Sequence, residues 1–124
     1  MKVPEKGFET ASIWGRYLRL NDRVIVDAAH NLPGIEALIQ NLKKDFPNTK
    51  PAFLVGIQKN KDVEGMINAI QKIAGKIYYC AFDPMRTRPF PLQTYQLGAP
   101  LPDDPLLVIT GSIYFIAHWA NELR

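Results

Sequence analysis

The sequence predicts an α/β fold of three layers, with a mainly parallel sheet between helices. Short apolar runs typical of buried strands alternate along the chain with segments whose apolar residues recur at helical spacing. Strands separated by helices pair in parallel through right-handed crossovers, which places helices on both faces of the sheet. A length of 124 residues corresponds to one domain, so we expect a single domain over residues 1–124.

An N-terminal β-hairpin opens the predicted fold. The runs Tyr17–Asn21 and Val24–Ala28 flank a turn-forming segment, and the second run begins with three apolar β-branched residues, as in a strand buried on both faces. A helix is expected next, because Asn31 can cap it and Pro33 suits its first turn. Its apolar face consists of Ile35, Leu38, Ile39, Leu42 and Phe46.

The next elements continue the alternation. Ala52–Val55 predicts a strand, Asp62 a helix cap, and Gly75 the stop of that helix. Further strands are expected at Lys76–Phe82 and Leu106–Thr110. A last helix follows, with Phe115, Trp119 and Leu123 on one face.

Residues 83–105 predict a long loop, because six of the ten prolines of the chain lie there. Each proline removes a backbone donor and restricts the residue before it, which disfavours a helix. One short strand is expected around Thr94–Leu97.

The composition excludes several classes of protein. With 47% hydrophobic residues and no apolar run near the ~18 residues of a membrane span, the chain reads as a soluble domain. The net charge of +3 is small and scattered, so no nucleic acid and no membrane partner is expected. The single cysteine, Cys80, excludes an internal disulfide and favours a reducing compartment, so we expect the cytoplasm.

Three predicted strand ends carry polar and glycine residues: Asp27–Asn31, Gly56–Asp62 and Thr110–Ser112. Parallel strands place their carboxyl ends at one edge of a sheet, where ligands bind in open α/β folds. Helices begin at the same edge and favour anions. The sequence therefore predicts a site for a phosphate or carboxylate ligand at this edge.

Each of these residues also has a structural interpretation. Asp27 and Asn31 suit helix caps, His30 a buried structural histidine with satisfied hydrogen bonds, and Ser112 an N-cap. Arg16 suits an ordinary surface arginine, and residues 61–62 a solvated turn.

Several sharper motifs are missing from the sequence. It has neither the phosphate loop of P-loop ATPases nor a Gly-x-Gly-x-x-Gly fingerprint. Ser112, His30 and Asp27 lack the Gly-x-Ser-x-Gly elbow of a hydrolase triad. With His30 and His118 as the only histidines, no metal site is expected.

Taken together, the strand-end motifs are more specific. Trp14-Gly15-Arg16, Asp27-Ala28-Ala29-His30-Asn31, Gly56 with Lys61-Asp62, and Thr110-Gly111-Ser112-Ile113-Tyr114 follow one another in the order found in one family. From about residue 7 to the end, the chain resembles the C-terminal domain of folylpolyglutamate synthase/dihydrofolate synthase, the folate branch of the Mur ligases. That domain has a Rossmann-like fold, in agreement with the alternation of strands and helices.

The resemblance implies an ATP-dependent amide ligase that adds L-glutamate to dihydropteroate or folate through an acyl phosphate. It implies ATP and Mg²⁺ as cofactors, bound mainly by an N-terminal P-loop ATPase domain that this chain lacks. That domain is the expected partner, in cis or in trans, beside glutamate and the folate or pteroate substrate. This chain alone is expected to be inactive.

The resemblance also assigns roles. Arg16 and Asp27 correspond to ATP-binding residues, and His30 and Ser112 to residues near the phosphate and glutamate. Three further motif residues, Asn31, Lys61 and Asp62, would support the site or domain closure. No catalytic residue is assigned with certainty.

The chain departs from the family pattern in four places. Ala28 stands where glycine is common, and Leu32 stands where the family continues with Asn-Pro, so that the proline comes one residue later, at Pro33. Trp14 replaces a usual proline, and residues 83–105 are shorter and richer in proline than a segment that normally carries a helix. An alternative is therefore a stand-alone binding or regulatory module that pairs with a separate ATPase subunit, with Ile13 and Trp14 as an apolar docking patch. A third hypothesis is a structural or regulatory remnant of the ligase domain that binds no ligand.

Overall fold

A six-stranded sheet, in the order β1-β2-β6-β3-β4-β5, forms the centre of the chain in the computed structural model. The structure describes residues 16–87 and 89–119. Only the β1–β2 pairing is antiparallel, and the other neighbouring strands run parallel. The strands are β1 (Leu18–Arg19), β2 (Val24–Asp27), β3 (Ala52–Val55), β4 (Lys76–Tyr79), β5 (Gln93–Thr94) and β6 (Leu107–Thr110). The predicted hairpin and mainly parallel sheet are confirmed.

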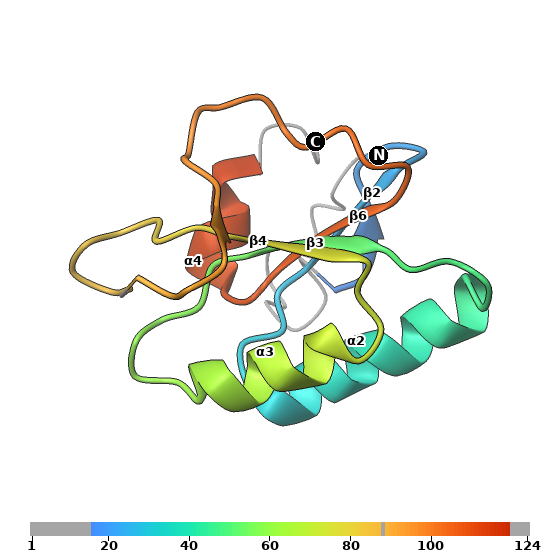
Figure 1. Cartoon of the computed structure of the whole chain (residues 1–124), viewed down its shortest axis with the longest axis horizontal. Coiled ribbons are helices and arrows are strands. Elements are labelled where there is room, and N and C mark those ends of the chain that lie inside the picture. Colours follow the sequence, from blue (N-terminus) through green and yellow to red (C-terminus); the bar gives the residue numbers. More distant parts are fainter. Residues whose placement is uncertain (1–15, 88, 120–124) are drawn as a thin grey trace, which may run out of the picture.

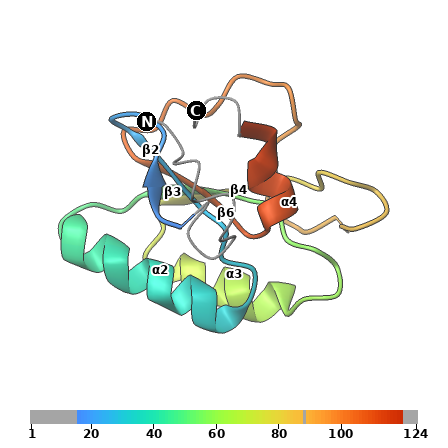
Figure 2. The same ribbon diagram turned by 180° about the vertical axis from the view of Figure 1, so that it is seen from behind.

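Helices cover both faces of the sheet. Figure 1 shows α2 (Leu32–Asp45) and α3 (Val63–Gln71) side by side below it, and the short α4 (Ile113–Ile116) above it. The view from behind in Figure 2 shows the same three layers. The predicted three-layer α/β sandwich is therefore confirmed. Within the described residues, no helix combines the length and the apolar character needed to cross a bilayer.

Two apolar clusters lie on opposite faces of the sheet, because successive side chains of a strand point to opposite sides. Ile25, Phe53 and Val108 pack against the apolar faces of α2 and α3. Leu54 and Ile109 pack against α4 and the aromatic residues beyond it. β3 and β6 are apolar almost throughout because both of their faces are buried.

Side-chain caps start the two long helices where the sequence predicts. Asn31 Oδ1 accepts a hydrogen bond from the N–H of Gly34 at 2.8 Å. Asp62 Oδ1 accepts from the N–H of Gly65 at 3.0 Å. Asp27 does not cap a helix, since it is the last residue of β2 and binds other backbone groups. The capping interpretation therefore holds for Asn31 and is wrong for Asp27.

Several predicted boundaries are corrected by the structure. The hairpin strands are shorter than Tyr17–Asn21 and Val24–Ala28, and β6 begins one residue after Leu106. The helix expected to stop at Gly75 ends at Gln71, because the next residues form turns. Gly75 serves a close approach instead: a Cβ there would lie 2.9 Å from the carbonyl oxygen of Lys50. Strand β4 ends at Tyr79 rather than Phe82, and the short edge strand lies at 93–94 rather than 94–97.

The described residues of the proline-rich segment 83–105 form a loop with the short strand β5 and no helix. Tyr95 is buried in the apolar cluster that contains Leu54, Ile109 and α4, which we call the α4-side cluster. Its ring centre lies 6.5 Å from that of Trp119. Its hydroxyl donates to the carbonyl of Ala99 at 2.6 Å. Predicted features at Ile13, Trp14, Gly15 and Leu123 lie outside the described residues.

Candidate functional site

The carboxyl ends of β2, β6, β3 and β4 meet at one edge of the sheet. Asp27 is in register with Thr110, which is in register with Val55, which in turn is in register with Tyr79. The loops after β3 and β4 and the start of α4 lie together at the left of Figure 1. The structure thus brings the three predicted strand ends to a common edge.

Asp27 ties the entry of the hairpin to the end of β2. Its Oδ1 accepts from the N–H of Tyr17 at 2.7 Å, and its Oδ2 accepts from the N–H of Ala29 at 3.0 Å. Burial raises the pKa of this carboxyl, while the two backbone donors and the positive charge of Arg16 pull its pKa in the opposite direction. Arg16 is exposed, so its guanidinium is available to an anion beside a partly buried carboxylate.

His30 is exposed and directly precedes Asn31, the N-cap of α2. Its Nδ1 lies 3.1 Å from the carbonyl oxygen of Ala28. A carbonyl oxygen only accepts, so this hydrogen bond requires the proton on Nδ1 and leaves Nε2 as an acceptor in the neutral ring. The interpretation of His30 as a buried structural histidine is wrong, because the residue is exposed.

Ser112 caps α4, as its structural interpretation predicts. Its Oγ accepts from the N–H of Tyr114 at 3.1 Å, and the residue is 1% exposed. The neighbouring Gly111 donates its N–H to the carbonyl of Ala29 at 3.1 Å. This backbone bond connects the Asp-Ala-Ala-His-Asn segment directly to the Thr-Gly-Ser segment.

Close backbone contact between β3 and β6 explains two glycines. Gly111 has φ of 119°, and a Cβ there would lie 2.5 Å from the carbonyl oxygen of Gly56. A Cβ on Gly56 would lie 2.6 Å from the ring of Phe115. Beside them, the hydroxyl of Thr110 is completely buried and has no hydrogen-bond partner among the described residues. At these two glycine positions, a side chain larger than hydrogen therefore does not fit.

Lys61 and Asp62 lie beyond β3 and are engaged locally. Asp62 caps α3, and the N–H of Lys61 donates to the carbonyl of Gln58 at 3.1 Å. In the described part of the chain, no hydrogen bond or ion pair joins either side chain to Asp27 or His30. The structure thus separates this pair from the group at the end of β2.

The sequence analysis missed one exposed feature of this edge, at the beginning of the proline-rich loop. Asp83 folds residues 83–87 into a turn that presents Met85 and Arg86, and the Arg86 guanidinium carbon lies 4.3 Å from the centre of the Tyr114 ring. An Asp-Pro pair followed by a threonine is a turn signal that the sequence carries at 83–87.

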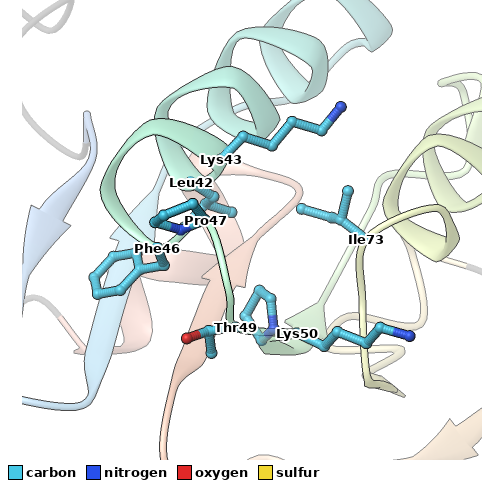
Figure 3. A pocket seen from close by; sticks show the side chains of 8 residues that line it. Leu42, Lys43, Phe46, Pro47, Thr49, Lys50 and Ile73 are labelled. Atoms are coloured by element: carbon cyan, nitrogen blue, oxygen red, sulfur yellow. The ribbon is translucent and has the colours of Figure 1, made fainter.

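A pocket of about 200 Å³ lies at the opposite edge, between the end of α2 and the end of α3 (Figure 3). Its lining combines apolar side chains with the two lysines Lys43 and Lys50, whose charged ends extend away from Leu42 and Pro47. None of the predicted site residues lines it. Within the described residues, no three His, Cys, Asp or Glu side chains gather as metal ligands require.

The comparisons with known proteins agree on one enzyme. No family model matches the chain. A curated relative, the dihydrofolate synthase/folylpolyglutamate synthase of Bacillus subtilis, is 28% identical in an alignment 120 residues long, and the match covers 82% of this chain and 28% of the relative. The chain therefore spans less than a third of that relative's length.

Solved structures support the same resemblance. The folylpolyglutamate synthase of Thermotoga maritima matches with a TM-score of 0.72 and 21% identity, over 99% of this chain and 34% of that one. A bifunctional folylpolyglutamate synthase/dihydrofolate synthase with Mn, AMPPNP and L-glutamate bound matches with a TM-score of 0.72 and 20% identity, over 98% of this chain and 35% of that one. The resemblance indicated by the sequence motifs is confirmed for fold and sequence.

Proposed function

We propose that this chain is the C-terminal domain of an ATP-dependent folate ligase, which joins L-glutamate to dihydropteroate or a folate. One observation carries the proposal beyond the resemblance. The Ala29–Gly111 backbone hydrogen bond holds the two family motifs together at the edge where α2 and α4 begin. Parallel α/β sheets bind ligands at this edge, outside the carboxyl ends of the strands.

Arg16 and Asp27 would face the nucleotide. The exposed guanidinium of Arg16 suits phosphate oxygens, whose charge grows during phosphoryl transfer. Asp27 uses one lone pair of each oxygen for a backbone N–H, so further lone pairs remain to accept from a ribose hydroxyl. In the reaction, the substrate carboxylate would take the terminal phosphoryl group of ATP and release ADP.

His30 and Ser112 would face the glutamate and the acyl phosphate. The hydroxyl of Ser112 accepts from a backbone N–H, so its own proton remains to donate to a carboxylate. The exposed His30 offers Nε2 at the same edge. The amine of glutamate would then attack the acyl carbon, form the amide and release phosphate. For Asn31 and Asp62 we propose the supporting role of helix caps, and for Lys61 a part in domain closure.

ATP and Mg²⁺ would be held mainly by the remaining portion of the ligase, joined in cis. The relative with AMPPNP, Mn and L-glutamate supports this proposal, because about two thirds of its length has no counterpart in the chain. The isolated chain would therefore not turn over ATP.

A test combines the chain with the ATP-binding portion of the Bacillus subtilis relative, as a fusion in place of the segment it matches. The assay measures ATP-dependent transfer of labelled glutamate to a folate. We expect activity in the fusion and none in the chain alone, with an Arg16→Ala fusion at least tenfold slower because one phosphate contact is lost.

Arg19→Ala is the matched control. Arg19 is an exposed arginine whose guanidinium bonds the carbonyl of Asp22 and stacks on Phe46, away from the strand ends. Its fusion should retain activity within twofold. Ligation by the isolated chain, or equal loss in both arginine variants, would contradict the proposal.

A further inference from the structure

A tight turn at residues 83–87 leads into the proline-rich loop at the end of β4. The carbonyl of Asp83 accepts from the N–H of Thr87 at 2.8 Å and from its hydroxyl at 2.7 Å. The carboxylate of Asp83 accepts from the N–H of Met85 at 2.9 Å. Thr87 is buried, so the turn is anchored at its base and presents its tip outward.

Arg86 is held on three sides by its surroundings. Its Nε lies 3.1 Å from Asp83 Oδ2, and its guanidinium carbon stacks 4.3 Å from the centre of the Tyr114 ring. Its backbone carbonyl accepts from the N–H of Lys59 at 2.6 Å, which ties the turn to the loop after β3. Within the described part of the chain, no hydrogen bond occupies the two terminal amino groups. Arg86 is thus a preorganised donor that still faces outward.

Two large apolar side chains flank this arginine. Met85 is 79% exposed and Tyr114 is 51% exposed, and among the described residues they are the exposed large hydrophobic side chains. Tyrosine, methionine and arginine are enriched at the centres of protein interfaces, and tyrosine and arginine recur among binding hot spots. Residues held in place before binding lose little entropy on association.

We infer that Met85, Arg86 and Tyr114 form a docking surface for an acidic, partly apolar surface of the ATP-binding portion of the ligase. Arg86 pairs there with a carboxylate of that portion, while Met85 and Tyr114 cover apolar area beside it. This inference rests on the proposed function, since it names the partner of the same sheet edge.

The position of the three residues supports a protein partner rather than a small ligand. Strands β2 and β4 are three strand spacings apart in the sheet, about 14 Å. Asp27 ends β2 and the turn that carries Arg86 follows β4, and within the described residues no hydrogen bond or ion pair joins these two side chains. A protein surface that covers this edge of the sheet can contact both the end of β2 and the turn after β4. The backbone of the exposed Lys59 is bonded to that of Arg86, so this part of the edge carries two basic residues, which favours an acidic partner.

The test is a calorimetric titration of the chain with the separately produced ATP-binding portion of the Bacillus subtilis relative. The variants are Met85→Ala, Arg86→Ala and the charge-reversing Arg86→Glu. We expect each alanine variant to weaken the Kd at least fivefold and Arg86→Glu to weaken it more. Arg86→Lys should recover part of the affinity, because it keeps the charge without the planar stacking. The wild-type affinity should fall with added salt.

Two controls separate a docking effect from unfolding and from the proposed function. Arg19→Ala and Lys72→Ala remove exposed cations away from the turn and should bind within twofold of wild type. Amide NMR shifts of Arg16, Asp27 and Gly111 on addition of AMPPNP report the nucleotide site, and the variants should match wild type there. The same spectra show whether each variant is folded.

Three results would overturn the docking surface. Equal affinity of all variants would place the contact elsewhere. Absence of any complex, with glutamate ligation by the wild-type fusion intact, would remove the docking inference and leave the proposed function standing. Absence of both the complex and ligation by the wild-type fusion would contradict the proposed function as well.

Discussion

The carboxylate of Asp27 holds the backbone of Tyr17 in the left-handed region. The N–H of Tyr17 donates to Asp27 Oδ1 at 2.7 Å, and Tyr17 has φ of 47°, unusual for a residue with a side chain. The hydroxyl of Tyr17 donates to Asp45 Oδ2 at 2.8 Å, so the residue is fixed at both ends between the hairpin and α2. A residue predicted to face a nucleotide thus also shapes the backbone that carries Arg16.

Asp27→Ala should therefore reduce stability as well as ligand binding. Two backbone N–H groups lose their acceptor, and we expect a loss of about 1–3 kcal/mol in the free energy of unfolding, measured by urea denaturation at neutral pH. The exposed Asp103→Ala is the matched control and should change stability by less than about 0.5 kcal/mol. A stability equal to wild type for Asp27→Ala would show that the two hydrogen bonds contribute nothing.

The raised pKa of Asp27 predicts a pH dependence of stability. Burial lifts the folded-state pKa above the ordinary value of 3.8, so the folded chain binds this proton more tightly than the unfolded chain does. Stability from this group is then greatest below pH 3.8 and falls as pH rises through the folded pKa. The asparagine of Asp27→Asn does not titrate, so the free energy of unfolding of wild type should fall relative to that of the variant as pH rises over that range. A constant difference would refute the raised pKa.

Gly111 and Gly98 form a matched pair for the close approach of β3 and β6. Both have positive φ, of 119° and 90°, but only Gly111 has neighbours within reach of a Cβ. Gly98→Ala should cost about 1 kcal/mol from backbone strain alone. Gly111→Ala adds a clash with the carbonyl of Gly56 and should cost roughly 3 kcal/mol or more. Equal melting temperatures for the two variants would contradict the close packing.

Thr110→Val tests the buried hydroxyl at the end of β6. The Oγ1 of Thr110 is buried without a hydrogen-bond partner among the described residues, which costs free energy in the folded state. Valine has nearly the same shape, so we expect equal or higher stability, up to about 1 kcal/mol, in urea denaturation. Destabilisation by more than that would reveal a partner for the hydroxyl.

Cys80 provides a probe of the α4-side cluster, since it is the single cysteine of the chain. Burial raises its thiol pKa from 9.0 to about 11. Reaction with a thiol reagent at pH 8 should therefore be at least a hundredfold slower in the folded chain than in denaturant. Stability should also fall as pH rises from 9.0 toward 11, because the unfolded thiol ionises first. Fast labelling of the folded chain would contradict the buried position.

The sheet and its two long helices were accessible from the sequence because their signals are local. Ala52–Val55 is bounded by turn residues and apolar throughout, and the structure has the strand at those residues. Asn31 and Asp62 precede periodic apolar segments and cap them as expected. Parallel pairing alone predicts that the strand ends meet at one edge of the sheet. The candidate site could therefore be located without knowledge of the side-chain geometry.

Other features depend on contacts between distant residues, which a local pattern does not contain. The bond from Tyr17 to Asp27 spans ten residues and replaced the expected helix cap. Stacking of Arg86 on Tyr114 joins segments that are 28 positions apart. Tyr114 belongs to a motif of the sequence, but no local pattern connects it to Arg86. Gly75 was read as a helix stop because glycine commonly ends helices, whereas its neighbour across space is Lys50.

The two outermost strands, β1 and β5, are only two residues long. Long flat edge strands leave rows of unpaired backbone groups that recruit strands from other molecules. In the described part of the chain these edge strands offer little free backbone, and two prolines lie just before β5, at positions 89 and 91. The chain is thus protected against edge-to-edge aggregation, even though the four strands between these edges are almost entirely apolar.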